Sequence, residues 1–420
     1  MAIIRKFPGN TDTGEFNTEQ LQAREPEAEM NLSQRLRLHR MKTFVGMLVS
    51  VAIIVVLLVI LIVYQKNVVF TQITTVHSVD RTNLETNSYI SNDGTIIVYS
   101  RDGIGCIDEN GDTIWNMTYE MQNPMVKKCS NYVGVCDFNG HNIMVTDMQG
   151  NTANIDTKLP IRDFAICKEG RVAVIIDDAT NSWVNLYDID GTKYSEIKAT
   201  MSQTGYPVTV AVSDEVMAVT YLYVDSDSMK SRVTFYNFGG VGENVTDKIV
   251  SNYEYDKVIV PIIEYFDSER IYAVADDRLL FFNGSKTPKD IKDILLSEKI
   301  VGVHSGSSMV GLVYYDTSGE KKYRLDLYNR SGDVVCSYRF NMDYKDIIIR
   351  NDQVIIYNEN QCVIVSHDGK EKYNGNFEEP VIAISATDSP KKFIFVKESI
   401  LSSVEFCNNI CNHLYFFSLK

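Results

Sequence analysis

The chain has 420 residues, of which 45% are hydrophobic, enough apolar material for a large folded core. It carries 41 Lys and Arg against 55 Asp and Glu, a formal net charge of −14. Eight basic and six acidic groups fall in residues 1–66, which leaves 33 and 49, a charge of −16, for residues 67–420. A surface this acidic, with no basic stripe and interleaved aromatic residues, excludes nucleic-acid binding.

Residues 1–43 form the first predicted region, a largely disordered head of mixed charge. It has few large apolar residues, and three glutamates gather within residues 25–29. Residues 28–42 have an alternative interpretation as a basic helix that continues into the next segment and lies on lipid headgroups. We favour the simpler interpretation, in which they are only the charged flank of that segment.

Residues 44–63 read FVGMLVSVAIIVVLLVILIV, without a charge, an amide or a proline. At about 1.5 Å per residue this run measures about 30 Å, the thickness of a bilayer's hydrocarbon core. The sequence therefore predicts a transmembrane helix over 44–64. A cleaved signal peptide is the rival interpretation, but its apolar region is shorter, its leading segment is shorter, and a small-residue cleavage site follows it.

Basic residues flank this predicted helix unequally. Four precede it closely, namely Arg35, Arg37, Arg40 and Lys42, whereas Lys66 is alone after it until Arg81. Because such residues stay on the cytoplasmic side of a span, we expect a cytoplasmic head and an extracytoplasmic C-terminal part. The expected location is the cell membrane, with a single pass.

After a predicted linker at 65–83, residues 84–420 repeat one unit of four short strands. Its marker is a tight turn with Gly between the last two strands, as in Glu109-Asn110-Gly111-Asp112. The marker glycines are at 111, 150, 191, 240, 284, 332 and 369, at steps of 37 to 49 residues. Four strands in a period near 40–45 residues indicate a β-propeller blade, so the predicted fold class is all-β. A β-sandwich would not show so regular a period.

The number of blades depends on the C-terminal end. After Gly369 the sequence offers four strand candidates, at 381–386, 392–397, 401–406 and 413–419, which would complete an eighth blade. The alternative is seven blades closed by strands shared between the two termini. Eight blades are favoured. One short helix, or else a loop, is expected at 289–296.

Eight cysteines lie beyond the predicted span, most of them in apolar strand patterns where a buried thiol acts as a small hydrophobe. Cys407 and Cys411, in CNNIC, are the candidate disulfide. A zinc site would need paired CxxC or histidine partners, and only His413 is close in sequence. No metal, cofactor-binding or catalytic residue is predicted.

The segment NGDTIW at 110–115 resembles the hairpin of the quinoprotein-like, or PQQ-like, propeller repeat. The whole layout resembles an uncharacterised Firmicutes membrane family, that of the domain of unknown function 5711, whose first blade holds a GDxIW followed by M-x-N-P. Here these are Gly111 to Trp115 and Met121 to Pro124. The resemblance implies an anchored propeller and brings no known activity.

The sequence therefore favours an envelope binding or scaffold module rather than an enzyme. His141, His304 and His367 are expected at turns or strand ends, since no HExxH, nucleophile elbow or phosphate loop accompanies them. The expected partners are the lipid bilayer and an envelope protein or glycan at the propeller face. Two alternatives stay open: a glycan-directed hydrolase with carboxylates in the propeller funnel, and a sensor or accessory subunit that signals through the span.

Overall fold

The computed structural model of the chain describes residues 32–66, 68–81, 87–92, 94–178, 180–350 and 352–408. The chain divides into two compact units, Met1–Asn67 and Val68–Lys420. Among the described residues, the first unit holds one α-helix and the second unit holds every strand. The predicted all-β fold after one apolar helix is confirmed.

The first unit contains α1 (Leu32–Lys66). Its segment Arg40–Ile60 is apolar enough to cross a membrane, and no side chain of that segment is buried. A helix with apolar side chains on all sides has no polar face to turn toward water. The helix also covers residues 32–43, which the sequence assigns to the disordered head. The rest of the predicted head, residues 1–31, lies outside the described residues.

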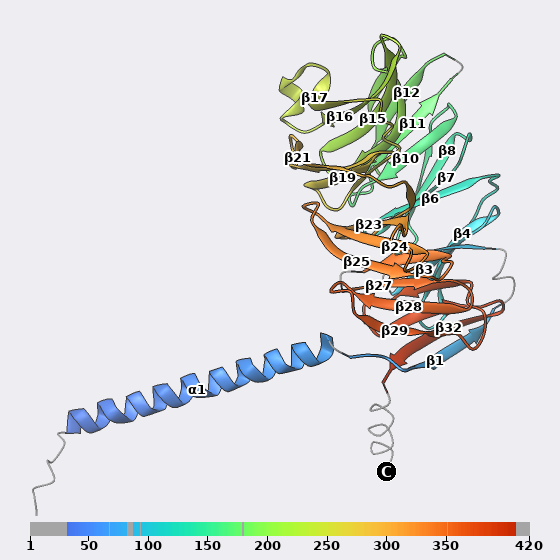
Figure 1. Ribbon diagram of the computed structural model, residues 1–420. Helices are drawn as coiled ribbons and strands as arrows, with labels where there is room; N and C mark the ends of the chain where they lie inside the picture. Colours follow the sequence, from blue (N-terminus) through green and yellow to red (C-terminus); the bar gives the residue numbers. More distant parts are fainter. Residues whose placement is uncertain are drawn as a thin grey trace, which may run out of the picture. The chain divides into compact units, whose positions relative to one another are not determined.

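The second unit is an eight-bladed β-propeller of eight four-stranded antiparallel sheets, which follow one another in chain order (Figure 1). Blade 1 is β2 (Ser88–Asn92), β3 (Thr95–Tyr99), β4 (Gly103–Asp108) and β5 (Thr113–Thr118). Blade 2 is β6 (Pro124–Cys129), β7 (Tyr132–Asp137), β8 (Asn142–Asp147) and β9 (Thr152–Asp156). Blade 3 is β10 (Ile161–Ile166), β11 (Val172–Asp177), β12 (Ser182–Tyr187) and β13 (Lys193–Ala199). Blade 4 is β14 (Tyr206–Val212), β15 (Val216–Asp225), β16 (Ser228–Asn237) and β17 (Ile249–Asp256), with the short 3-10 helices η2 (Gly242–Asn244) and η3 (Thr246–Lys248) before β17.

The other four blades repeat the arrangement. Blade 5 is β18 (Ile262–Tyr265), β19 (Arg270–Val274), β20 (Arg278–Asn283) and β21 (Lys289–Leu295). Blade 6 is β22 (Ile300–Ser305), β23 (Met309–Tyr315), β24 (Tyr323–Asn329) and β25 (Val334–Phe340). Blade 7 is β26 (Asp346–Ile349), β27 (Gln353–Tyr357), β28 (Gln361–Ser366) and β29 (Glu371–Asn376). Blade 8 is β30 (Ala383–Ala386), β31 (Lys392–Val396), β32 (Ile400–Cys407) and, as its outer strand, β1 (Gln72–Asp80).

The core consists of layers between blades. Eight clusters of buried apolar side chains occur among the described residues, and each draws its members from two adjacent blades. The second and third strands of a blade contribute to the clusters on both sides, so they read as continuous apolar runs, for example VAVIID in β11. The first strands of neighbouring blades contact one another, as in β10 with β14 and β2 with β30, which places them at the inside of the ring.

The predicted glycines lie between the third and fourth strands of blades 1 to 7, as expected, but in blade 4 the connection is a longer segment with η2 and η3 instead of a tight turn. In blade 2, Gly150 has a φ of 87°, a conformation that costs little only for glycine. The Oδ1 atom of Asp147 accepts hydrogen bonds from the backbone N–H groups of Gln149 and Asn151, both at 2.9 Å. Asp108 and Asn329 cap the turns of blades 1 and 6 in the same way. In blades 1, 2 and 6 the turn signature therefore also includes an Asp or Asn three residues before the glycine, whereas Phe281 and Ser366 stand at that position in blades 5 and 7.

Blade 8 is closed by the N-terminal strand. β1 pairs antiparallel with β32 from Gln72 opposite Cys407 to Asp80 opposite Ile400, and Figure 1 shows the blue and red strands side by side. Just before β1, the buried Phe70 ring packs 5.9 Å from Phe406, and its N–H donates to the carbonyl of Lys372 in blade 7 at 2.6 Å. The N-terminal segment therefore joins blade 8 to blade 7.

Three sequence expectations need correction here. The prediction of eight blades is confirmed, but the outer strand of blade 8 is β1 and not 413–419, which lies outside the described residues. Residues 72–80 thus belong to the propeller rather than to the linker placed at 65–83. The short helix expected at 289–296 is wrong: this segment is β21, where a register shift against β20 disturbs the strand alternation and imitates a helical spacing.

We expect Phe70→Ala to weaken ring closure. Removing this buried ring leaves a cavity at the junction of blades 7 and 8, so the free energy of unfolding should fall by about 3–5 kcal/mol. Val69→Ala is the matched control, because Val69 is 55% exposed and should change stability by less than about 0.5 kcal/mol. Denaturant unfolding of both variants measures the difference in stability. Equal effects would show that Phe70 does not stabilise the junction of blades 7 and 8.

We expect Asp147→Ala to destabilise the blade 2 turn by about 1 kcal/mol, since two backbone N–H groups lose their acceptor. Asp147→Asn keeps an oxygen at the same place and should unfold at nearly the parent denaturant concentration. If the asparagine variant lost as much stability as the alanine variant, the carboxylate charge would matter rather than the capping geometry.

Candidate functional site

The connections of an antiparallel blade alternate between the two faces of the ring. First-to-second and third-to-fourth connections lie on one face, and second-to-third and blade-to-blade connections lie on the other. Residues 68–71 reach β1 at its Gln72 end, which pairs with the last residue of β32. The chain therefore enters the propeller on the face of the glycine turns, which we call the tethered face. The other face is called the opposite face.

Among the described residues the inner strands carry three carboxylates, and each contacts a polar side chain of a neighbouring blade. Asp163 accepts from Lys127 Nζ at 2.7 Å and from Thr209 Oγ1 at 2.8 Å, which ties blade 3 to blades 2 and 4. Glu264 accepts from Ser305 Oγ at 2.6 Å, and Asp346 Oδ1 lies 3.4 Å from His304 Nδ1. These groups connect neighbouring inner strands around the ring.

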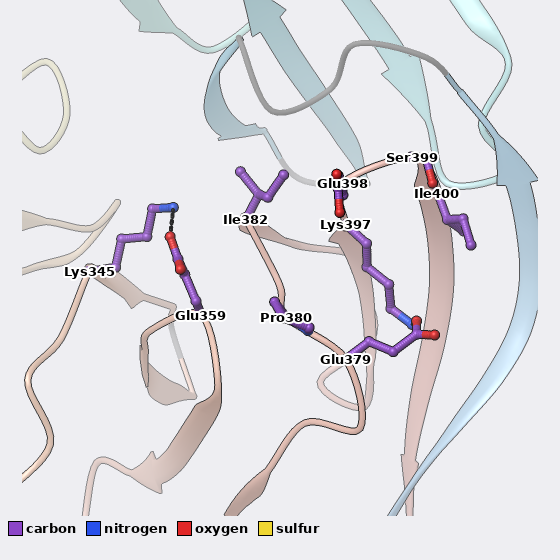
Figure 2. Close-up of a pocket in the computed structure, with 9 residues that line it drawn as sticks. All are labelled: Lys345, Glu359, Glu379, Pro380, Ile382, Lys397, Glu398, Ser399 and Ile400. Carbon is purple, nitrogen blue, oxygen red and sulfur yellow. Dashed lines mark hydrogen bonds and ion pairs between the residues drawn. The ribbon is translucent and has the colours of Figure 1, made fainter.

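The opposite face is hollowed where blades 7 and 8 meet. This hollow, the seam groove, has a volume of about 480 Å³. Its lining residues are Lys345, Glu359, Glu379, Pro380, Ile382, Lys397, Glu398, Ser399 and Ile400 (Figure 2). They come from the loops before β26 and β30, from the turns before β28 and β32, and from the start of β32.

Charged side chains line both sides of the seam groove. Lys345 Nζ lies 3.3 Å from Glu359 Oε1, and Lys397 Nζ donates to Glu379 Oε2 at 2.6 Å. Figure 2 shows these two pairs on opposite sides, with Pro380 and Ile382 between them. The Lys397 ammonium lowers the pKa of Glu379, which keeps that carboxylate ionised in mild acid. Glu398 belongs to neither pair, so the lining has one net negative charge.

A second cavity of about 450 Å³ adjoins the seam groove and shares Glu379 and Lys397 with it. It extends toward the outer strands, where Ile73 of β1 and Tyr373 of β29 form part of its lining. No His or Cys is among the lining residues of either cavity. Paired charges beside apolar surface can hold a peptide or loop of a partner by hydrogen bonds and contact.

The structure does not gather the residues singled out from the sequence into one catalytic centre. Cys407 ends β32 and Cys411 lies outside the described residues, so their disulfide stays a prediction. Arg35, Arg37, Arg40 and Lys42 all fall within α1. Within the described ranges, no group of three His, Cys, Asp or Glu side chains could hold a metal ion.

Buried thiols lie in the blade cores, as expected for small hydrophobic side chains. Burial raises the pKa of Cys136 and of Cys167 to about 12. Such thiols stay protonated and unreactive at neutral pH.

Sequence reasoning missed the seam groove. Its lining residues come from loops of two different blades, and their spacing in the chain forms no motif. No local signal in the sequence marks this groove.

Solved structures similar to this chain include the three that follow, all of low sequence identity. BamB from Moraxella catarrhalis is 12% identical, with a TM-score of 0.45, over 80% of this chain and 100% of that chain. Apo AztD from Citrobacter koseri is 11% identical, with a TM-score of 0.48, over 70% of this chain and 87% of that one. Sqt1 from Saccharomyces cerevisiae is 11% identical, with a TM-score of 0.47, over 80% and 99%.

Likeness at these identities identifies no activity or partner. No curated protein matches the sequence. A family model does match, over residues 66–406, a range that begins at the last residue of α1 and ends in β32. The chain therefore belongs to the family described as "Family of unknown function (DUF5711)".

Proposed function

We propose that this protein is a single-pass membrane protein whose propeller binds a partner in the cell envelope. The observation that carries the proposal is the uncharged, apolar stretch of α1 at residues 44–63, which comes shortly before the strand that closes the ring. Only residues 67–71 separate α1 from β1. Five residues span at most about 18 Å, so a membrane-embedded α1 would hold the propeller close to the bilayer.

The basic residues of α1 support a cytoplasmic N-terminus. Arg35, Arg37, Arg40 and Lys42 lie in its first turns, whereas its other end has Lys66 alone. By the positive-inside rule the propeller then lies outside the cytoplasm. Within the propeller, the seam groove lies on the opposite face, away from the face where the chain enters the ring.

The seam groove is the proposed partner site. Its two ion pairs are partly exposed and the apolar Pro380 and Ile382 lie between them, which suits a protein segment that brings apolar and polar groups together. The inner-strand carboxylates support binding over the hydrolase alternative. A glycan hydrolase of the usual kind uses two carboxyl groups that act on the substrate, and Asp163, Glu264 and Asp346 each contact another side chain instead.

We expect a protease added to intact cells to cut the propeller at a cleavage site inserted beside Gly319. This glycine lies in the loop between β23 and β24, where a Cβ atom added to it would meet no other atom within 4 Å, so an insertion should be tolerated. Immunoblotting of the C-terminal fragment measures the cut.

The same cleavage site inserted after Gly9 is the matched control and should be cut only after lysis. Cutting at residue 9 in intact cells, with the propeller protected, would reverse the proposed orientation. Protection of both sites until lysis would place the propeller in the cytoplasm.

We expect a photo-crosslinking amino acid at Ser399 to give a discrete adduct in native cells. Ser399 is exposed and lines the seam groove. Lys397→Glu should weaken the adduct, because the reversed charge breaks the ion pair with Glu379 and makes the groove more negative. Gel mobility and mass spectrometry measure the adduct.

Ser226 is the matched control position. It is exposed in the second-to-third connection of blade 4, on the same face of the ring. An equal adduct from Ser226, or an adduct from Ser399 that Lys397→Glu leaves unchanged, would remove the seam groove as the partner site.

A further inference from the structure

A second groove lies on the flank of the propeller, between blades 2 and 3. It has a volume of about 450 Å³ and is called the lateral groove. Its lining residues are Asp156, Thr157, Lys158, Leu159, Ile176, Trp183, Asn185, Tyr187, Gly191, Lys193 and Glu196. Blade 2 contributes the end of β9 and the residues after it, and blade 3 contributes strands β11, β12 and β13.

A buried amide in this groove has unused hydrogen-bonding capacity. Asn185 is only 2% exposed, and its Nδ2 donates to the hydroxyl of Tyr187 at 3.2 Å. Its Oδ1 has no hydrogen-bond partner among the described residues. Turning the amide over would exchange its two ends and leave Nδ2 unpartnered instead. A buried polar atom without a hydrogen-bond partner lowers the stability of the fold. Proteins commonly keep such destabilising groups where they serve binding.

Apolar and aromatic groups surround this amide. Trp183 and Tyr187 precede and follow Asn185 at strand spacing, so the three side chains lie on one face of β12. Tyr187 is buried and Trp183 is half-buried, and both belong to the apolar layer between blades 2 and 3. Because the Oδ1 atom itself is covered, a ligand reaches it only after a lining side chain such as Trp183 moves.

The charges at the groove rim cancel. Lys158 pairs with Asp156, and Lys193 Nζ donates to Glu196 at 2.5 Å. Hydrogen bonds from Lys158 lower the pKa of Asp156 to about 2, so this pair stays ionised across the physiological range. A rim of two neutralised pairs offers donors and acceptors without a net field, which favours an uncharged, polar ligand.

We propose that the lateral groove binds a neutral oligosaccharide. A sugar ring has an apolar C–H face that fits an indole, here that of Trp183. Its hydroxyl groups both donate and accept, so they satisfy whichever end of the Asn185 amide is unpartnered. The rim carboxylates and ammonium groups bind the remaining hydroxyls. This site is separate from the seam groove and does not depend on the proposed membrane orientation.

Tryptophan fluorescence tests the proposal, since the chain has only two tryptophans. Trp115→Phe removes the buried one and leaves Trp183 as the reporter in the full chain, held in a sugar-free detergent. Trimers of N-acetylglucosamine, of β-1,4-glucose and of α-1,4-glucose are the probes. We expect a saturable change in Trp183 emission with at least one of them. Calorimetric titration of the unaltered chain gives the same answer if Trp115→Phe does not fold.

Asn185→Leu distinguishes a binding role from a structural one. We expect it to weaken sugar affinity about tenfold or more, since the amide's hydrogen bonds are lost, and to leave the unfolding midpoint equal or higher. Asn237→Leu is the matched control. Asn237 is fully buried, and both ends of its amide have partners: Nδ2 donates to the carbonyl of Lys286, and Oδ1 accepts from the N–H groups of Gly239 and Gly242. This change should therefore lower the unfolding midpoint without acting on the lateral groove.

Two results would overturn the proposal. One is the absence of a saturable response to all three sugars. The other is sugar binding that Asn185→Leu leaves unchanged, which would place the ligand elsewhere on the chain.

Discussion

The pairing of β1 with β32 is the constraint on which the propeller depends. A ring of sheets has no free end only if its last blade is completed, and an unpaired β32 would present an open edge. The strand that completes it comes from more than 300 residues earlier in the chain. Loop-closure entropy grows only with the logarithm of that separation, so the paired strand and its packed side chains can offset it.

Closure is reinforced at both the outside and the inside of the ring. At the inside, Ser385 Oγ of blade 8 donates to the carbonyl of Thr95 at 2.7 Å and lies 3.0 Å from Ser91 Oγ, both of blade 1. At the outside, the Arg81 side chain donates a hydrogen bond to Thr113 Oγ1 of blade 1 at 3.1 Å. The backbone N–H of Phe70 donates to the carbonyl of Lys372 in blade 7. The N-terminal segment thus contacts three consecutive blades, and the ring gains cooperativity from one short piece of chain.

Most of the propeller could be predicted because its determinants are local. The glycine turns and the Val- and Ile-rich second strands act within about ten residues, and they recur in every blade from 1 to 7. The closing strand could not be predicted in the same way: QITTVHSVD in β1 carries no turn marker and its side chains are mostly exposed, as in an outer strand. The position of β1 in the propeller is determined by its pairing with β32, which lies far away in the sequence. The outer strand β21 differs from the expected helix for a related reason, since it is largely exposed and the register shift against β20 disturbs its alternation.

Neither groove could be predicted, because each is formed by segments that two blades bring together and that are not adjacent in the sequence. The closing strand also has a consequence for the seam. Gln72, Ile73 and Thr75 of β1 line the cavity that adjoins the seam groove. That wall exists only while β1 is paired with β32. By linkage, any ligand that contacts this wall binds the closed ring in preference to the open one, and the stabilisation of closure grows with the logarithm of ligand concentration once that exceeds the dissociation constant. A ligand bound against this wall would therefore be coupled to ring closure through β1, the strand that follows α1 after residues 67–71.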